Sequence, residues 1–136
     1  MTQPERFTSK VAIVTGAGSG IGRAVALRLA AEGGSVFAVD VDEGRLEETL
    51  SLGAAGITTH RADLGDPDAC AAVVTECLAA HSRLDVLGNV AGIYLAGHAT
   101  DVTLEQYRRV MAVNLDACFF LSQAALPHLL ERAGTS

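Results

Sequence analysis

The chain has 136 residues, enough for at most one domain, and 49% of them are apolar, which is ample for a hydrophobic core. Its net charge of −6 argues against nucleic acid or an anionic membrane surface as a partner. The 3 cysteines form no CxxC pair and the 4 histidines show no metal-ligand spacing, so we expect neither a disulfide framework nor a metal site. The polar residues 2–9 do not resemble a signal peptide, and we therefore expect a cytoplasmic protein.

The most informative segment is a glycine-rich turn after the first predicted strand, residues 11–15. Apolar residues recur at helical spacing behind the turn. The first N–H groups of a helix lack intrahelical partners and, together with the helix dipole, favour an anion such as a pyrophosphate. Gly16 would permit the sharp turn, Gly20 the close approach of the ligand, and Gly22 tight packing of helix on strand. A simple strand–helix turn would explain one or two of these glycines. A GxxxxGK[ST] loop is excluded because Lys10 is the only lysine.

The second predicted strand, 35–40, ends in an acidic residue. In dinucleotide-binding folds an acidic residue about 20 positions after the glycine turn binds the ribose hydroxyls. Asp40 stands at a suitable distance from Gly16, and the sequence shows no arginine in the glycine turn or next to Asp40. The carboxylate of Asp40 suits NAD and would repel the 2′-phosphate of NADP, so we expect NAD to be preferred. The alternative is that Asp40 or Asp42 caps the next helix, for which Asp42 is better placed.

The remaining pattern is an alternation of strands and helices. Strands are predicted at 11–15, 35–40, 57–62 and 84–90, and helices at 20–32, 43–52, 67–80 and 103–131. Asp66 followed by Pro67 predicts the start of the third helix, and the spacing of Thr103 and Gln106 predicts a capping box. This alternation predicts an α/β fold, a Rossmann-type doubly wound parallel sheet with strand order 3-2-1-4 and its ligand beyond the carboxyl ends of the strands.

Four motifs stand in one order along the chain. They are Thr15-Gly16-Ala17-Gly18-Ser19-Gly20-Ile21-Gly22, Asp63-Leu64, Asn89-Val90-Ala91-Gly92 and Asn114. They resemble the TGxxxGxG signature, the adenine-contacting Asp, the NNAG segment and the catalytic asparagine of the short-chain dehydrogenase/reductase family, with Val90 in place of the second Asn of NNAG. The cofactor-binding residues that the glycine turn, Asp40 and this resemblance indicate are Gly16, Ser19, Gly20, Ile21, Gly22, Asp40, Asp63, Leu64, Asn89, Ala91 and Gly92, and the catalytic residue is Asn114.

The resemblance implies NAD-dependent hydride transfer with an alcohol or ketone substrate, but it also implies a Ser and a Tyr-x-x-x-Lys pair. Four residues after Tyr94 and Tyr107 stand His98 and Met111, so neither tyrosine begins such a pair. We therefore expect residues 1–136 to be the NAD-binding Rossmann half of a single domain, inactive alone. We expect the catalytic half to lie beyond Ser136 in a longer protein; the alternative is a truncated gene product.

Two other classes of function remain open from the sequence. One is a nucleotide-binding module without catalysis, acting as a sensor or subunit. The other is a different Rossmann enzyme such as a methyltransferase. The spacing of Gly16 and Gly20 and the segment 89–92 argue against the methyltransferase.

The segment 112–130 is apolar on all sides of a predicted helix, although polar residues interrupt it and argue against a membrane span. Such a helix is normally buried on more than one face. We expect one face on the sheet and the other against either a second subunit or a segment missing from this chain. The family resemblance implies the second subunit, with Phe120 and Leu121 at or beside the interface. Asn114 in mid-helix is either a solvent-facing residue or the centre of a local kink whose polar groups hold a water.

Overall fold

The computed structural model describes residues 5–53 and 55–134, so the ends of the predicted domain lie outside the described residues. In the described part, one parallel sheet has the strand order β3-β2-β1-β4. β1 (Val11–Thr15) lies between β2 (Ser35–Asp40) and β4 (Val86–Gly88), and β3 (Ile57–Arg61) pairs with the outer side of β2. The predicted fold class and order are confirmed.

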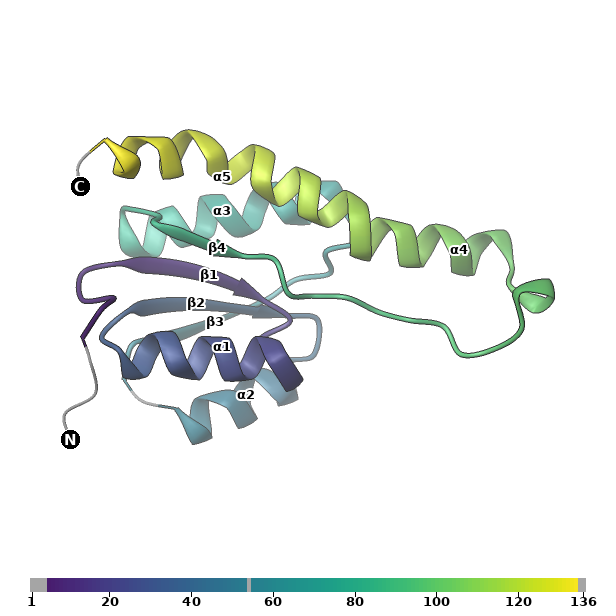
Figure 1. Ribbon diagram of the computed structural model, residues 1–136, viewed down its shortest axis with the longest axis horizontal. Helices are drawn as coiled ribbons and strands as arrows, with labels where there is room; N and C mark the ends of the chain where they lie inside the picture. Colours follow the sequence, from purple (N-terminus) through teal and green to yellow (C-terminus); the bar gives the residue numbers. More distant parts are fainter. Residues whose placement is uncertain (1–4, 54, 135–136) are drawn as a thin grey trace.

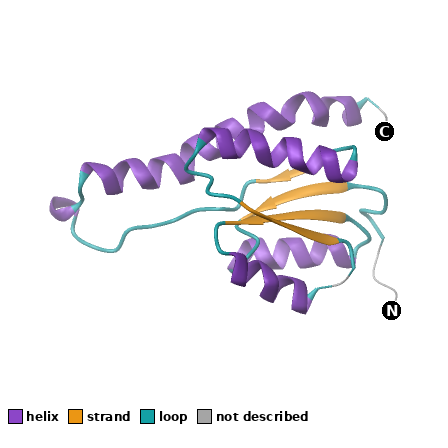
Figure 2. Ribbon diagram, turned by 180° about the vertical axis from the view of Figure 1, so that it is seen from behind, coloured by secondary structure: helices purple, strands orange, loops and turns teal. Residues whose placement is uncertain are grey.

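Helices cover both faces of this sheet (Figures 1 and 2). One face carries α1 (Gly20–Ala31) and α2 (Glu43–Leu52), and the other carries α3 (Pro67–His81) and α5 (Ala117–Ala133). Side chains of consecutive strand residues point to opposite faces. Ile13 of β1 therefore packs in the core under α3 and α5, and Val14 packs in the core under α1 and α2. Two apolar cores enclose the sheet, which fixes the positions of its carboxyl ends.

The predicted helix starts are confirmed by their caps. The carboxylate of Asp42 accepts a hydrogen bond from the backbone N–H of Arg45 at the start of α2. Asp66 caps α3 in the same way, with Pro67 at the first helical position. Thr103 and Gln106 form the predicted capping box of α4 (Leu104–Met111).

The predicted strand 84–90 and the predicted helix 103–131 both differ from the structure. The strand is shorter, since only Val86–Gly88 pairs with β1. The backbone N–H groups of Val90 and Ala91 do not pair with β1 and instead donate hydrogen bonds to the side chain of Thr15. A short 3₁₀ turn, η1 (Ala99–Asp101), precedes α4, and a π-helical turn, η2 (Ala112–Asp116), joins α4 to α5. The mid-helix irregularity expected at Asn114 is therefore present.

The outward side of α5 and of the turn before it carries an apolar stripe, which we call the outer stripe. It consists of Leu115, Phe119, Leu126 and Leu130, each more than half exposed. The expectation that Leu121 lies on this side is wrong, because its side chain is 1% exposed and belongs to the core under α3 and α5. By length and composition alone, the helical run Leu104–Ala133 could cross a membrane, because it contains an 18-residue window with a mean hydropathy of 1.3, of which 22% is buried.

Candidate cofactor-binding site

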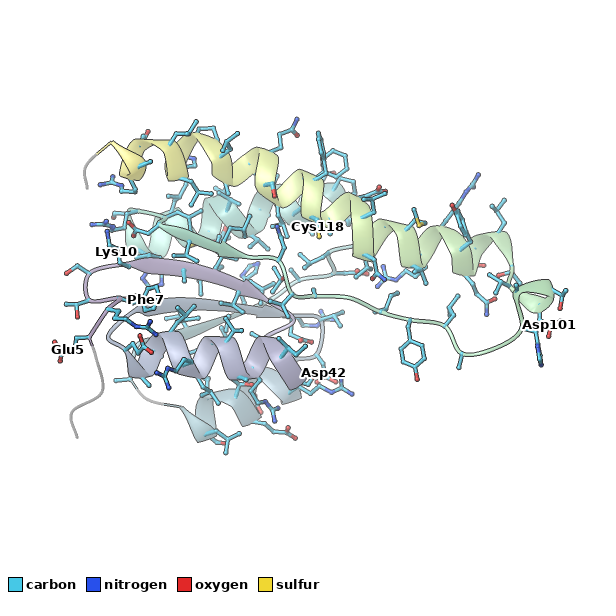
Figure 3. All side chains as sticks on the ribbon, in the orientation of Figure 1. Glu5, Phe7, Lys10, Asp42, Asp101 and Cys118 are labelled. Atoms are coloured by element: carbon cyan, nitrogen blue, oxygen red, sulfur yellow. The ribbon has the colours of Figure 1, made fainter. Side chains whose placement is uncertain are left out.

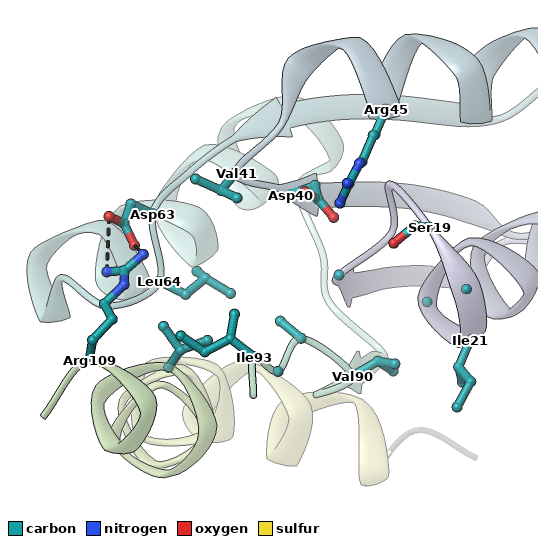
Figure 4. A pocket seen from close by; sticks show the side chains of 16 residues that line it. Ser19, Ile21, Asp40, Val41, Arg45, Asp63, Leu64, Val90, Ile93 and Arg109 are labelled. Atoms are coloured by element: carbon teal, nitrogen blue, oxygen red, sulfur yellow. Dashed lines mark hydrogen bonds and ion pairs between the residues drawn. The ribbon is translucent and has the colours of Figure 1, made fainter. Parts of the chain in front are cut away.

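A cavity of about 330 Å³ lies at the carboxyl ends of the strands, where the fold predicts a ligand (Figure 4). Ten residues expected from the sequence line it: Gly16, Ser19, Gly20, Ile21, Gly22, Asp40, Asp63, Leu64, Ala91 and Gly92. Six more were not expected: Val41, Arg45, Val90, Ile93, Arg109 and Val113. The cavity therefore combines a glycine turn, two carboxylates and two arginines with apolar walls.

The glycine turn has the geometry that an anion site needs. Gly16 adopts φ +66°, and a Cβ atom there would lie 2.9 Å from Cα of Ala91, so the sharp turn and the close packing both require glycine. At Gly20, with φ +53°, a Cβ atom would meet no protein atom within 4 Å and would project into open space. Ser19 is the N-cap residue of α1, yet its side chain makes no capping hydrogen bond. The first N–H groups of α1 are thus available to a bound anion.

Neighbouring side chains hold this turn rigidly. The buried hydroxyl of Thr49 donates a hydrogen bond of 2.8 Å to the carbonyl oxygen of Ala17. The guanidinium of Arg23 donates to the carbonyl oxygen of Gly18 at 2.5 Å and forms an ion pair with Glu48 at 2.9 Å. Because Thr49 of α2 and Arg23 of α1 bind these two carbonyl oxygens, the N–H groups of the turn are oriented before any ligand arrives.

Asp40 is fixed by two backbone hydrogen bonds. Its Oδ2 accepts from the N–H of Gly18 at 3.0 Å, and its Oδ1 accepts from the N–H of Asp42 at 3.0 Å. Each carboxylate oxygen has a second lone pair, so both can still accept a hydroxyl of a ribose. The same two contacts show that the carboxylate does not cap α2, whose cap is Asp42.

The sequence has no arginine in the glycine turn or next to Asp40, but the fold brings Arg45 close to that carboxylate. A Cβ atom on Gly18 would lie 2.8 Å from Cγ of Asp40 and 2.9 Å from Cβ of Arg45, so both side chains pack against the same glycine. Figure 4 shows Arg45 reaching from α2 towards Asp40 along the cavity wall. Its guanidinium also lies 3.7 Å from the carboxylate of Asp42.

Of the residues that follow β4, some line the cavity and others lie outside it. Thr15 is 1% exposed, and its hydroxyl oxygen accepts hydrogen bonds of 3.0 Å from the N–H groups of both Val90 and Ala91. This places 90–92 against the glycine turn. Asn89, which the sequence assigned to the cofactor site, is not among the residues that line the cavity. Its amide donates a hydrogen bond of 3.3 Å to Ser122 of α5.

Asp63 and Leu64 line the end of the cavity beyond Asp40. The guanidinium of Arg109 approaches both oxygens of Asp63, and the N–H of Gly65 donates to the same carboxylate at 3.0 Å. These hydrogen bonds, that from Arg109 first, hold the pKa of Asp63 below its ordinary value. The carboxylate is therefore ionised at neutral pH.

Asn114 does not line the cavity, but it binds a residue that does. Its side-chain oxygen accepts a hydrogen bond of 2.8 Å from the N–H of Ile93, and its amide donates one of 2.7 Å to the carbonyl oxygen of Ile93. The π-helical turn directs the amide to this backbone. Asn114 is exposed, as the first expectation has it, but its side chain is bound to the backbone of Ile93. The local irregularity of the second expectation is confirmed, whereas the water stays a prediction.

Other chemistries find no support in the described residues. No group of three or more His, Cys, Asp and Glu side chains there could hold a metal ion. Cys70 and Cys77 are buried, and burial raises the pKa of Cys77 to about 11, so its thiol is a poor nucleophile at neutral pH. The cavity is thus the best-formed candidate site of the described residues.

Comparison with known proteins identifies the class. The sequence pattern of the short chain dehydrogenase family matches residues 10–136, and the chain belongs to this family. It is 37% identical over 134 residues to the meso-2,3-butanediol dehydrogenase of Serratia marcescens, covering 95% of this chain and 52% of that protein. The family assignment supports the dehydrogenase class over a methyltransferase.

Two solved structures give the same class. The 3-ketoacyl-(acyl-carrier-protein) reductase of Brucella melitensis complexed with NADH superimposes with a TM-score of 0.87 and 30% identity, covering 94% of this chain and 53% of that one. A metagenomic short-chain oxidoreductase in complex with NADP gives a TM-score of 0.84 and 35% identity, covering 93% and 59%. The chain therefore spans about half the length of the relatives it matches.

Proposed function

We propose that this chain is the cofactor-binding part of an oxidoreductase that moves hydride between a nicotinamide cofactor and a small alcohol or ketone, and that it prefers NAD to NADP. The observation that carries the proposal is the pairing of an uncapped helix N-terminus at the glycine turn with the fixed carboxylate of Asp40 in one cavity. The first feature suits a pyrophosphate and the second suits ribose hydroxyls. When bound, the nicotinamide would supply the hydride.

The residues present fit such a cofactor. The backbone at Ser19, Gly20 and Ile21 would hold the pyrophosphate, and Asp40 would accept the hydroxyls of the adenosine ribose. Asn114 would act through the backbone of Ile93, which it holds against the cavity. Asn114 is the one member of the catalytic set implied by the family resemblance that the described residues contain, because neither Tyr94 nor Tyr107 precedes a lysine by four positions.

The preference for NAD rests on charge. A 2′-phosphate would lie beside the Asp40 carboxylate, and this like-charge contact should cost about 1–2 kcal/mol or more, which is roughly tenfold in affinity. Arg45 on the same wall opposes this repulsion, although its guanidinium is already near Asp42. The structures of relatives with NADH and with NADP support a nicotinamide cofactor of either kind.

Calorimetric titration of NAD and NADP tests the preference. Wild-type protein should bind NAD at least about tenfold more tightly. Asp40→Asn removes the charge beside the ribose and should reduce that ratio. The matched control Asp42→Asn removes the same charge but keeps a side chain that caps α2, and it should leave the ratio unchanged. Equal or tighter binding of NADP by the wild type contradicts the assignment.

We also propose that the 136 residues alone do not transfer hydride. An amide such as that of Asn114 does not titrate near neutral pH and cannot exchange a proton with the substrate, a step that general acid–base groups typically accelerate by about 10²–10⁴-fold. Turnover of NADH with a panel of ketones by a protein of verified mass ending at Ser136 would contradict this. The alternative is a nucleotide-binding module, which would bind NAD without turnover even in a longer protein.

The remaining expectations are proposals as well. We propose a homo-oligomer that pairs through the helix at 112–130, supported by the exposed outer stripe. We propose a cytoplasmic location as well. The net charge of −6 supports a protein that has neither nucleic acid nor a membrane as its partner.

A further inference from the structure

Helix α4 and the segment before it project beyond the sheet (Figures 1 and 3). Residues 92–103 are exposed, and α4 contains no buried residue. Asp101, at the far tip, is labelled in Figure 3. Apolar burial therefore does little to hold α4 in place, and its position depends on the helical run that continues it through η2 into α5 and on contacts of its own side chains.

The ion pair between Arg109 and Asp63 provides such a contact. The distances are 3.1 Å from Nη1 to Oδ2 and 2.9 Å from Nη2 to Oδ1, a two-pronged arrangement drawn in Figure 4. Among the described residues, this pair is the one hydrogen-bonded or ionic link between the side chains of α4 and any strand, helix or loop outside its own cap. It joins residues 46 positions apart in the sequence.

Gly65 makes room for this arrangement. A Cβ atom at position 65 would collide with Nη1 of Arg109, although the backbone of Gly65 does not adopt a positive φ. The side chains of Arg109 and Asp63 are 45% and 51% exposed, and pairs that are this exposed contribute little to stability. Both line the cavity, so the consequence of the pair lies in the site and not in the core.

The position of the Asp63–Arg109 pair in the cavity indicates which part of a bound cofactor the pair would contact. With the pyrophosphate at the glycine turn and the ribose at Asp40, the base carried by that ribose extends towards Val41, Asp63 and Leu64. The ionised carboxylate of Asp63 retains lone pairs that can accept from an exocyclic amino group such as that of adenine. Arg109 holds that carboxylate in position and belongs to the helix that leads, through the π-helical turn, to Asn114.

We propose that Arg109 is a positioning residue. Through its ion pair with Asp63, it makes two events interdependent: binding of a base at the end of the cavity near Asp63, and docking of α4 against that residue. This proposal rests on the proposed cofactor function. By thermodynamic linkage, if a bound base stabilises the Asp63–Arg109 arrangement, then docking of α4 increases the affinity for the base by the same factor.

Adjacent arginines on α4 give a matched pair of variants. Arg109→Gln removes a charge from the cavity wall, and Arg108→Gln removes the same charge from a neighbouring exposed position that does not line the cavity. We expect Arg109→Gln to weaken NAD binding about three- to fivefold and Arg108→Gln to leave it within error of the wild type. Nicotinamide mononucleotide, which lacks the adenosine, should bind both variants and the wild type equally.

Two further variants separate position from charge. Gly65→Ala keeps every charge but displaces the guanidinium of Arg109, so it should weaken NAD binding as Arg109→Gln does. Arg109→Lys keeps the charge but cannot form the two-pronged pair, and it should recover only part of the affinity. Hydrogen exchange should show NAD protecting the amides of 104–111 in the wild type and in Arg108→Gln, and less in Arg109→Gln.

The outcomes are distinct. Failure of the wild type to bind NAD overturns the proposed function and this proposal with it. Normal binding with equal effects of Arg108→Gln and Arg109→Gln overturns this proposal alone, because long-range charge then explains the effect. Unchanged protection of 104–111 in Arg109→Gln also overturns it. The proposal is supported if Arg109→Gln and Gly65→Ala both weaken the binding of NAD and leave the binding of nicotinamide mononucleotide unchanged.

Discussion

Replacing Thr15 by Val should destabilise the protein and loosen the segment after β4. Val has nearly the same shape as Thr, so the buried site at the end of β1, which is 1% exposed, stays filled. The hydroxyl oxygen, however, is the acceptor for the N–H groups of both Val90 and Ala91, and the hydroxyl also donates to the carbonyl oxygen of Gly88 at 3.3 Å. Valine can make none of these three contacts.

The magnitude follows from the two donors left without a partner. A buried polar group without a hydrogen bond costs about 1–3 kcal/mol. Val90 and Ala91 are partly exposed, so water replaces part of the loss and the lower end applies to each. We expect a decrease of about 2 kcal/mol in the free energy of unfolding, a large share of the roughly 5–15 kcal/mol of a typical domain. NAD affinity should fall as well, because 90–92 line the cavity.

Urea unfolding of the wild type, Thr15→Val and Thr15→Ser provides the assay. The serine variant keeps the hydroxyl and loses one buried methyl group, which is worth about 0.8 kcal/mol. Thr15→Val should therefore be clearly less stable than Thr15→Ser. If Thr15→Val equals or exceeds Thr15→Ser in stability, the hydroxyl is not the anchor of this segment and the reasoning is refuted.

Three more predictions concern other parts of the molecule. Gly20→Asn should abolish NAD binding with a urea midpoint close to wild type, because Asn tolerates the positive φ while its side chain fills the open space; normal binding by the folded variant would show that this turn is not the phosphate site. The hydrogen bonds from Arg6 and Arg28 hold the pKa of the Glu32 carboxyl at about 2 against the ordinary 4.5. The stability that the Glu32 carboxylate contributes should therefore be present above pH 4.5 and be lost as the pH falls towards 2. The difference in unfolding free energy between wild type and Glu32→Gln should be smaller at pH 3 than at pH 6. A constant difference would contradict the role of these hydrogen bonds. Phe119 is 61% exposed on the outer stripe, so Phe119→Glu places a charge there and should lower the mass measured by light scattering; an unchanged oligomer would show that this face is not the interface.

Local and periodic features could be predicted from the sequence. The glycine turn and the Asp66 cap depend on residues that are neighbours in the chain, and the alternation of strands and helices determines the parallel sheet and its order. The positions of Asp40 and Asp63 at the cavity follow from the rule that the carboxyl ends of parallel strands meet at one edge.

Features that depend on long side chains from other elements could not be predicted. Arg45 reaches Asp40 from α2, and Arg109 reaches Asp63 across 46 positions, and no spacing rule signals either contact. Asn89 belongs to a matching motif, yet its amide turns to α5 because β4 ends at Gly88 and the chain bends towards Thr15. β4 is shorter than predicted because the hydroxyl oxygen of Thr15 accepts hydrogen bonds from the backbone N–H groups that follow it. Strand propensity alone does not indicate such a contact.

A crystal structure of the protein with NAD tests the central claim most directly. The account predicts the pyrophosphate against the N-terminus of α1, near Ser19 and Gly20, with the hydroxyls of the adenosine ribose on Asp40 and the adenine beside Asp63. A cofactor bound elsewhere, or a dinucleotide in this cavity whose ribose does not contact Asp40, would contradict it.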